Sequence, residues 1–168
     1  MPGERIVVIG CCGCGKSTLS KQLSQRLGLP VVHLDRLYWR GNWTPVTNED
    51  FDGALKVELG KPRWIMDGNF SRTMAWRMSC CDTVIYMDFP RWLCVYGVLK
   101  RVLLNYGKTR EDMGQNCPER FDPAFLNDVW NFNRKNRDKM YKRIGELEGK
   151  EIILLHNRKE CRQFLSRI

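Results

Sequence analysis

The sequence has no apolar run long enough to cross a membrane. Its longest stretches, residues 6–12 and 92–99, are far shorter than the roughly 20 residues that a spanning helix needs. The first residues lack the basic and then apolar order of a signal peptide, because the apolar segment leads directly into glycines. We therefore expect neither a membrane protein nor a secreted one, but a cytoplasmic protein.

Histidine is scarce, and the cysteines do not form a metal-binding or disulfide pattern. His33 and His156 are the only two histidines, and they stand far apart. The eight cysteines do not show the C-x2-C…C-x2-C spacing of a zinc site, and Cys11, Cys12 and Cys14 crowd one short segment. We expect reduced thiols, as in a cytosolic protein.

The chain also lacks internal repeats, low-complexity tracts and linkers rich in proline, glycine or serine. Its 168 residues, of which 43% are hydrophobic, suit one globular domain with its own core. We expect a single domain over residues 1–168, which acts as a monomer or a dimer.

Charge is unevenly distributed along the chain. The formal net charge is +9, and residues 91–143 carry twelve basic and six acidic side chains. A basic excess of this kind indicates a polyanionic partner, either the phosphates of a nucleotide or a nucleic acid.

Short apolar stretches alternate with segments of helical periodicity. Strands are expected at residues 5–9, 30–35, 63–67, 83–88 and 151–155, and helices through 19–27, 51–59, 91–105 and 123–147. Helices between short strands predict a three-layer α/β/α fold around a parallel sheet. Residues 106–121 are polar, charged and glycine-containing, and this loop is long enough to suggest a function.

Residues 10–17 match the phosphate-binding pattern G-x-x-x-x-G-K-[ST] in full. Glycines let backbone N–H groups approach phosphate oxygens, and the helix that follows adds the positive end of its dipole. In this pattern Lys16 reaches the β- and γ-phosphates, and the Ser17 hydroxyl ligates Mg²⁺. The motif predicts ATP as a ligand and the following contacts: Gly10, Cys11, Cys12, Gly13, Cys14, Gly15, Lys16, Ser17 and Thr18.

The chain carries no N-K-x-D guanine motif and is shorter than most motor ATPases, which leaves a small phosphotransferase as the common class at this size. The loop thiols lie beside Lys16 at a helix N-terminus, a setting that predicts a lowered thiol pKa and a reactive thiolate.

Four further segments accompany the loop, at residues 30–39, 64–73, 82–92 and 117–122. With them the chain resembles the small P-loop kinases related to adenylate, shikimate and gluconate kinases, and most of all the bacterial proteins described as DNA topology modulation proteins. The resemblance implies a five-stranded parallel sheet in the order 2-3-1-4-5, a lid at about residues 106–121, and ATP with Mg²⁺. In this chain cysteines replace the usual small residues of the loop.

The resemblance also implies roles for two aspartates. Asp35 is expected at the end of the second strand, on the sheet edge where open α/β proteins bind ligands. There it would hold the acceptor hydroxyl or a Mg²⁺-bound water, unless it is only a solvated strand end. Asp67 at the end of the third strand would orient Mg²⁺ through water. Asp88 ends the fourth strand and is either a further acid of this kind or a turn residue.

The acceptor region implied by the resemblance follows Asp35. It includes Arg36, Tyr38 and Trp39, and with Trp43 these aromatic residues either stack on a planar acceptor or pack beneath the loop. Arg72 matches the arginine that holds an acceptor phosphate, and it is structural if the acceptor carries none.

Basic residues of the lid and of the long helix would surround the transferring phosphoryl group. Phosphoryl transfer needs such cations, supplied by a closing lid, and the candidates are Arg101, Arg110, Arg134 and Arg137. Their alternative role is a solvated basic face. Asn157 and Arg158 follow the fifth strand, where related kinases pass the backbone over the adenine ring.

Two hypotheses therefore stand. The first is an ATP- and Mg²⁺-dependent kinase that acts on a small-molecule or nucleotide acceptor, which the sequence does not name. The second is a nucleic-acid-binding regulator that binds or hydrolyses ATP. The second is disfavoured, because the sequence shows no helix-turn-helix signature, RNP-like aromatic set or zinc finger.

Overall fold

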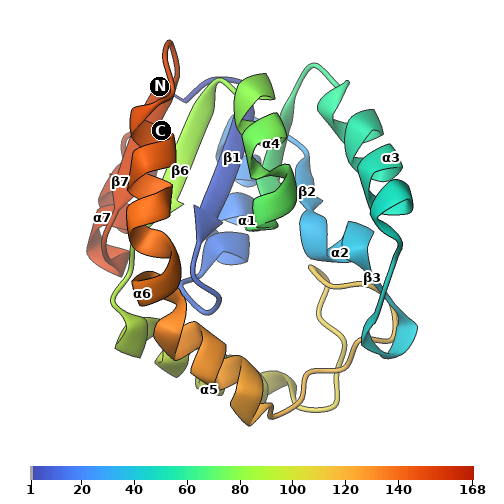
Figure 1. Ribbon diagram of the computed structural model, residues 1–168. Coiled ribbons are helices and arrows are strands. Elements are labelled where there is room, and N and C mark those ends of the chain that lie inside the picture. The colour runs from blue at the N-terminus through green and yellow to red at the C-terminus, as the bar shows by residue number, and fades with distance from the viewer. Residues whose placement is uncertain (1) are drawn as a thin grey trace.

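The computed structural model describes residues 2–168, and its centre is a five-stranded parallel sheet (Figure 1). The strands are β1 (Arg5–Gly10), β2 (Val31–His33), β5 (Trp64–Asp67), β6 (Thr83–Met87) and β7 (Glu151–Leu155). Their order across the sheet is β2-β5-β1-β6-β7. Counted within this sheet alone, the order is 2-3-1-4-5, as expected.

The central strands are apolar because helices cover both faces of the sheet. Ile6, Val7, Val8 and Ile9 of β1 are completely buried. Strands that are buried on both faces read as continuous apolar runs rather than as alternating ones. This is why the short apolar stretches of the sequence predicted the strands.

Six helices of seven or more residues build the two outer layers. They are α1 (Lys16–Leu27), α3 (Asn48–Leu59), α4 (Met74–Cys80), α5 (Arg91–Asn105), α6 (Pro123–Gly145) and α7 (Arg158–Leu165). Buried residues of α1, α5, α7 and the first half of α6 form one apolar cluster. Those of α3, α4 and the second half of α6 form the other. The three-layer α/β/α fold is confirmed.

Local capping signals in the sequence locate the helix ends. The Thr47 side chain accepts a hydrogen bond from the Asp50 backbone N–H at 3.1 Å, and α3 begins there. Asp122 caps α6 in the same way through the Phe125 N–H at 3.1 Å. Gly28 ends α1 with φ 65°, a left-handed conformation that glycine adopts without strain.

The expected second strand is shorter than predicted. β2 ends at His33, which pairs with Asp67, the last residue of β5. Since β2 is an edge strand and its one neighbour stops there, residues 34 and 35 have no strand to pair with. The chain instead enters the short helix α2 (Leu34–Tyr38), and Asp35 lies in its first turn. The helices α4 and α7 were not predicted.

Beyond α2 the chain forms a small hairpin, β3 (Trp39–Arg40) and β4 (Thr44–Pro45). Residues 106–121, here called the lid segment, contain no helix and only two isolated bridges. The lid segment contacts the hairpin: Asn42 N–H donates to the Asn116 carbonyl at 2.8 Å, and Trp43 Nε1 to the Pro118 carbonyl at 3.1 Å. In Figure 1 the lid segment, drawn in yellow, bridges α5 and the hairpin beyond the carboxyl ends of the strands.

Among the described residues, none of the helices has the length and apolar character that a membrane crossing requires.

Candidate active site

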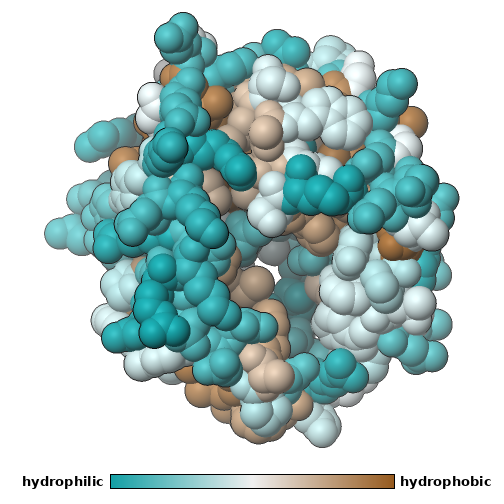
Figure 2. Space-filling view, viewed as in Figure 1, coloured by the Kyte–Doolittle hydropathy of each residue, from teal (hydrophilic) through white to brown (hydrophobic). Residues whose placement is uncertain are grey.

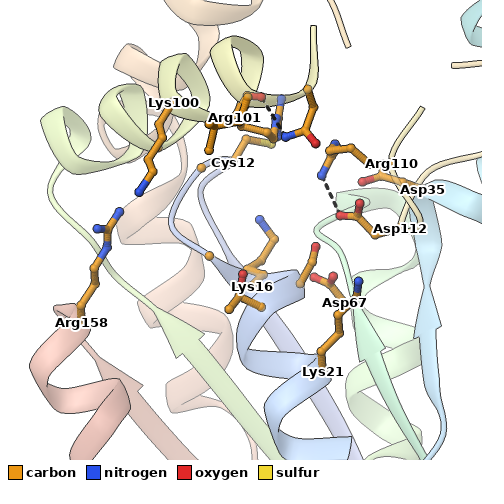
Figure 3. A pocket seen from close by; sticks show the side chains of 17 residues that line it. Cys12, Lys16, Lys21, Asp35, Asp67, Lys100, Arg101, Arg110, Asp112 and Arg158 are labelled. Carbon is orange, nitrogen blue, oxygen red and sulfur yellow. Dashed lines mark hydrogen bonds and ion pairs between the residues drawn. The ribbon is translucent and has the colours of Figure 1, made fainter. Parts of the chain in front are cut away.

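The phosphate-binding loop connects β1 to α1 at the carboxyl edge of the sheet. Gly13 and Gly15 adopt φ 81° and 101°, which other residues rarely do. Lys16 is the first residue of α1, and its ammonium donates to the Cys11 carbonyl at 3.0 Å. Figure 3 shows the Lys16 side chain pointing into the pocket above the loop. Burial acts to lower the Lys16 pKa, but the acidic groups around it, the loop cysteines and Asp67, raise that pKa overall.

Asn69 holds the start of this loop in place. Its side-chain amide donates to the Gly10 carbonyl at 2.8 Å and accepts from the Gly10 N–H at 3.1 Å. Arg77, which is completely buried, in turn donates to the backbone carbonyls of Gly68, Asn69 and Phe70. The loop is therefore supported by the segment that follows β5. Neither residue was predicted to belong to the site, because nothing in the sequence marks Arg77 as buried.

A close contact between two glycines joins α5 to the same loop. A Cβ atom on Gly97 would overlap the Gly13 carbonyl oxygen, and one on Gly13 would overlap the Cys94 carbonyl oxygen. The missing side chains let α5 lie directly against the loop backbone. The sequence did contain a signal for Gly97, a glycine in the middle of a predicted helix. Such a glycine lowers helix stability by about 1 kcal/mol relative to alanine, so its presence indicates a packing or functional requirement.

A pocket of about 360 Å³ opens above the loop and is here called the loop pocket. Six basic side chains line it, together with three acidic ones. The basic ones are Lys16, Lys21, Lys100, Arg101, Arg110 and Arg158. A concave, positively charged site beside backbone N–H groups suits a polyphosphate. Arg158 and Lys100 face each other across one side of it (Figure 3).

The carboxylates of the loop pocket gather opposite Arg158. Asp67 ends β5, is 5% exposed, and contacts His33 Nδ1 through Oδ2 at 2.9 Å. Asp35 lines the same pocket, and burial and the negative charge of Asp67 raise its pKa. With the Ser17 hydroxyl, these groups fit Mg²⁺, which takes one or two carboxylates and completes its shell with water and substrate phosphates.

Asp112 of the lid segment is a third carboxylate, which the sequence analysis missed. It pairs with Arg110 at 2.7 Å and lines the loop pocket. Burial acts to raise its pKa, but Arg110 and a hydrogen bond from Ser17 hold the pKa below the ordinary aspartate value. The lid segment thus reaches the phosphate-binding loop. No local pattern in the sequence singles out this aspartate among the other charged residues of the loop.

A second pocket of about 500 Å³ adjoins the first and is here called the aromatic pocket. Its aromatic residues come from three separate segments, the hairpin, the chain after β5 and α6: Trp39, Trp43, Phe70 and Phe125. Four residues line both pockets: Cys12, Asp35, Arg101 and Arg110. The space-filling view shows a hollow in the middle of this face of the molecule, between α6 and the hairpin side (Figure 2).

Most of the predicted loop residues, and several predicted beyond the loop, lie around these two pockets. The loop pocket is lined by Cys12, Gly13, Gly15, Lys16, Ser17, Thr18, Asp35, Asp67, Arg101, Arg110 and Arg158. Trp39 lines the aromatic pocket, whereas Arg36 lies on the other side of Trp39 in a separate surface pocket. Tyr38 packs edge-on against Phe51 and Phe70, so its role here is packing. Asn157 caps α7 by accepting from the Glu160 N–H at 3.0 Å.

Arg134 and Arg137 are not brought to either pocket. The prediction that these two arginines of the long helix surround the transferring phosphoryl group does not match the structure. Arg137 donates to Asp88, with Nε–Oδ2 at 2.9 Å, and the Asp88 side chain is only 1% exposed. Arg134 lines a surface pocket beside Trp92 and Trp130. The middle of α6 is polar because a buried carboxylate after β6 needs a cation and hydrogen-bond donors, which α6 supplies.

Arg72 also lies outside both pockets. Its guanidinium forms a two-point ion pair with Asp52 of α3, at 2.8 and 2.6 Å. Both partners are exposed to solvent, so the pair holds the chain after β5 against α3. Of the two roles considered for Arg72, the structure favours the structural one.

The expectation of reactive thiolates is wrong for two of the three loop cysteines. Cys11 and Cys14 are buried, at 2% and 4% exposure. Burial raises the pKa of Cys14 to about 12, and the Cys11 pKa is raised by a hydrogen bond to the Cys94 side chain and by burial. Their side chains turn into the core behind the loop and line neither pocket. Cys12 is half-buried and lines both pockets.

No protein-family model and no curated protein sequence matches the chain. Solved structures do. A "putative kinase" from Chloroflexus aurantiacus J-10-fl matches with a TM-score of 0.56 and 18% sequence identity, over 96% of this chain and 94% of that one. A gluconokinase from Sinorhizobium meliloti 1021 matches with a TM-score of 0.59 and 15% identity, over 99% of this chain and 93% of that one.

At these identities the likeness shows the fold, an α/β architecture shared with kinases over nearly the whole chain. The narrower resemblance to DNA topology modulation proteins finds no support in these comparisons.

Proposed function

We propose that this protein is a kinase that transfers the γ-phosphoryl group of ATP to a hydroxyl group of a small molecule. The observation that carries the proposal is the junction of the two pockets. A basic pocket above a phosphate-binding loop meets an aromatic pocket at Asp35, Cys12, Arg101 and Arg110. A phosphoryl donor and an acceptor bound in these pockets would meet beside a carboxylate and two arginines.

The donor end would use the loop backbone and Lys16. Backbone N–H groups of the loop and the N-terminus of α1 point toward phosphate oxygens, and Lys16 neutralises the β- and γ-phosphates. Ser17 and Asp67 would hold Mg²⁺ in the loop pocket. When bound there, the ion would supply positive charge that offsets the charge of the phosphates. His33 contributes by orienting the Asp67 carboxylate through their 2.9 Å contact.

The transfer itself needs positioning rather than covalent catalysis. The acceptor oxygen attacks the γ-phosphorus, and the bond from that phosphorus to the β,γ-bridging oxygen breaks. ADP leaves with the electron pair, and the hydroxyl proton passes to the Asp35 carboxylate. Arg101 and Arg110 stabilise the charge that develops on the transferring group. Glu119 holds both arginines in place, at 2.9 Å from Arg101 and 2.7 Å from Arg110.

The lid segment would cover the reacting groups. It supplies Arg110 and Asp112 to the pocket, and Glu111 contacts Lys21 of α1 at 2.7 Å. The Glu111–Lys21 contact and the hydrogen bond between Ser17 and Asp112 cross from the lid segment to α1, so opening of the lid segment would break both. Exclusion of water at this point strengthens the electrostatic interactions and limits wasteful hydrolysis of ATP.

The proposal is tested by ATP binding and by ADP release. Calorimetry should show Mg-ATP binding that Lys16→Ala weakens roughly 10- to 150-fold, because a hydrogen bond to a charged group contributes about 1.5–3 kcal/mol. Lys159→Ala, an exposed lysine of α7, is the matched control. ADP release should then rise with at least one hydroxylated small molecule of a panel, in which gluconate is included because one structural neighbour is a gluconokinase. Unchanged ATP affinity in folded Lys16→Ala would refute the donor site.

A further inference from the structure

We infer that the acceptor is an uncharged molecule with a planar ring and a free hydroxyl group, of the nucleoside class, and that it carries no phosphate. The inference deepens the proposed function and rests on it, because it assigns the aromatic pocket to the acceptor. The charges and the aromatic residues of that pocket carry it together.

The arginines of the aromatic pocket already face carboxylates. Arg101 and Arg110 both bind Glu119, which is 5% exposed, and Arg110 also binds Asp112. Arg120, the third arginine, lies 4.0 Å from Asp122. When ATP is bound, Arg101 and Arg110 also border the loop pocket and would turn to its γ-phosphate. Arg101 and Arg110 are therefore committed, and Arg120, whose side chain is 63% exposed, is the arginine of this pocket that remains.

The carboxylates of the aromatic pocket outnumber its cations. Four acidic side chains line it against three arginines: Asp35, Glu119, Asp122 and Asp128. Asp35 forms no ion pair among residues 2–168. Asp128 is paired with Lys135 at 3.4 Å. Asp35 is therefore the acid that a phosphate or carboxylate on the acceptor would meet without an ion-pair partner beside it, and that contact is repulsive. Arg72, the one arginine expected to hold an acceptor phosphate, is bound to Asp52 outside the pocket.

Two aromatic residues of the pocket are held in strained backbone conformations. Trp43 and Phe70 have φ 59° and 37°, in the left-handed region that bulky residues rarely occupy. Trp43 donates through Nε1 to the Pro118 carbonyl of the lid segment, and the Phe70 carbonyl accepts from Arg77 of α4. Such strain persists where the surrounding structure imposes it, and it is common at ligand sites.

Two of the aromatic rings that line this pocket are already covered by cations: the guanidinium groups of Arg120 and Arg101 lie over the Trp43 and Phe125 rings, each 5.8 Å from the ring centroid. Trp39 and Phe70 are the rings that a planar ligand would use. The Trp39 and Trp43 rings lie 5.7 Å apart at 70°, and Phe70 and Phe125 line the same space. Aromatic side chains stack on planar ligands with little dependence on the identity of the ring. The volume of about 500 Å³ is within the usual range for small-molecule sites. A nucleoside supplies both parts: a ring for this pocket and a sugar hydroxyl that reaches Asp35.

The transfer then balances as for any kinase. The sugar hydroxyl oxygen forms the new bond to the γ-phosphorus, the bond to the bridging oxygen breaks, and ADP takes the electron pair. The proton of the hydroxyl goes to Asp35. The product is a nucleoside monophosphate, and its new phosphate lies at the arginine-lined junction rather than among the acidic residues.

The test compares acceptor classes at saturating Mg-ATP. Initial rates of ADP release are measured with ribo- and deoxyribonucleosides, with their 5′-monophosphates, and with a linear sugar acid that has no ring. We expect at least one nucleoside to raise ADP release tenfold or more above the rate with ATP alone. The monophosphates and the sugar acid should reach less than a tenth of its kcat/KM. Nuclear magnetic resonance of phosphorus identifies the product.

The variant Trp39→Leu tests whether the nucleoside stacks in the aromatic pocket. Loss of one stacking face should raise the KM for the nucleoside roughly 5- to 150-fold and leave ATP affinity unchanged. Trp39→Phe should restore most of the affinity, which also shows that the fold tolerates substitution there. Trp92→Leu is the control, since this tryptophan is 62% exposed on α5 and lines neither pocket.

The outcomes separate the two proposals. Preference for a monophosphate or the sugar acid overturns the acceptor class while phosphoryl transfer stands. Lys16-dependent ATP binding without turnover of any nucleoside also overturns it. Absence of ATP binding refutes the proposed function and this inference with it.

Discussion

His33 and Asp67 lie side by side at the carboxyl ends of β2 and β5, with Nδ1 and Oδ2 2.9 Å apart and both side chains almost excluded from solvent. Because the two residues pair in register, the sheet itself sets their separation. The contact occupies one oxygen of Asp67 and leaves the other for the loop pocket. His33 is therefore a positioning residue for the carboxylate that we assign to Mg²⁺.

The first prediction follows from this pair. His33→Phe keeps a ring in the core and removes the partner of Asp67, so the apparent Mg²⁺ affinity should fall about 10- to 100-fold, as for other residues that orient metal ligands. A Mg²⁺ titration of ADP release measures it. His156→Gln, at the exposed end of β7, should leave the titration unchanged. An unaltered Mg²⁺ dependence in folded His33→Phe would remove His33 from the site.

Substitution of Asp35 and substitution of Asp67 should reduce turnover in different ways. Asp67→Asn should reduce all Mg²⁺-dependent turnover, including slow hydrolysis of ATP without acceptor, because it disturbs the metal. Asp35→Asn should spare that background hydrolysis and remove the acceptor-dependent rate by about 100-fold, the usual contribution of a general base. Coupled assays of ADP with and without acceptor separate the two. Equal loss of both activities in both variants would show that the roles are divided wrongly.

Gly97 tests the contact between α5 and the loop. Gly97→Ala places a Cβ on the Gly13 carbonyl oxygen, so α5 or the loop must move. We expect the free energy of unfolding to fall by about 1–3 kcal/mol, as for overpacking elsewhere, and ATP affinity to fall at least tenfold. Gly53→Ala on α3, where a Cβ meets nothing within 4 Å, should be neutral or slightly stabilising. Urea unfolding and calorimetry give both quantities.

The three loop cysteines should differ sharply in reactivity. The Cys14 pKa of about 12 keeps this group a thiol near pH 8, and thiolate forms only as the pH rises toward that value. Cys11 is buried and its pKa is raised as well. Iodoacetamide at pH 8 should therefore label Cys12 first, and bound Mg-ATP should slow this labelling. Peptide mass spectrometry reports each site. Labelling of Cys14 at the same rate as Cys12 would contradict the burial described here.

The sequence predicted those parts of the protein that local signals define. Glycines with positive φ, the lysine at the start of α1 and the capping threonine of α3 act within a few residues of one another, so their spacing is informative. The strands were predicted for a related reason: burial on both faces leaves an uninterrupted apolar run. Even there, the end of β2 depended on where β5 stops.

The partners of charged side chains could not be predicted in this way. Arg137 and Arg110 are both arginines in a basic segment, yet one binds Asp88 and the other binds Asp112 and Glu119. Which carboxylate each one meets is decided by how α6 and the lid segment pack, contacts that span up to 49 residues. The same holds for Arg77, whose partners are backbone carbonyls. Sequence spacing does not record these contacts.

The last prediction concerns the basic residues of 91–143, which lie on two separate surfaces of the protein. Arg101 lies at the junction of the two pockets, whereas Arg134 lies beside Trp92 and Trp130 on the outer surface of α5 and α6. Arg101→Gln should therefore weaken ATP binding about tenfold or more, since it removes a charged hydrogen-bond donor. Arg134→Gln should leave ATP binding unchanged.

Binding of nucleic acid should respond to these two substitutions in the opposite way: Arg134→Gln should weaken it, and Arg101→Gln should not. Exposed arginines beside exposed aromatic rings give weak binding of single strands, which depends steeply on salt because it releases counterions. Fluorescence anisotropy with a labelled oligonucleotide should thus show binding at low salt that Arg134→Gln reduces and that disappears near physiological salt. Mg-ATP should not compete, because the two surfaces are separate. Sequence-selective binding that survives physiological salt would instead favour a nucleic-acid-binding regulator, and the kinase proposal would then have to account for both ligands.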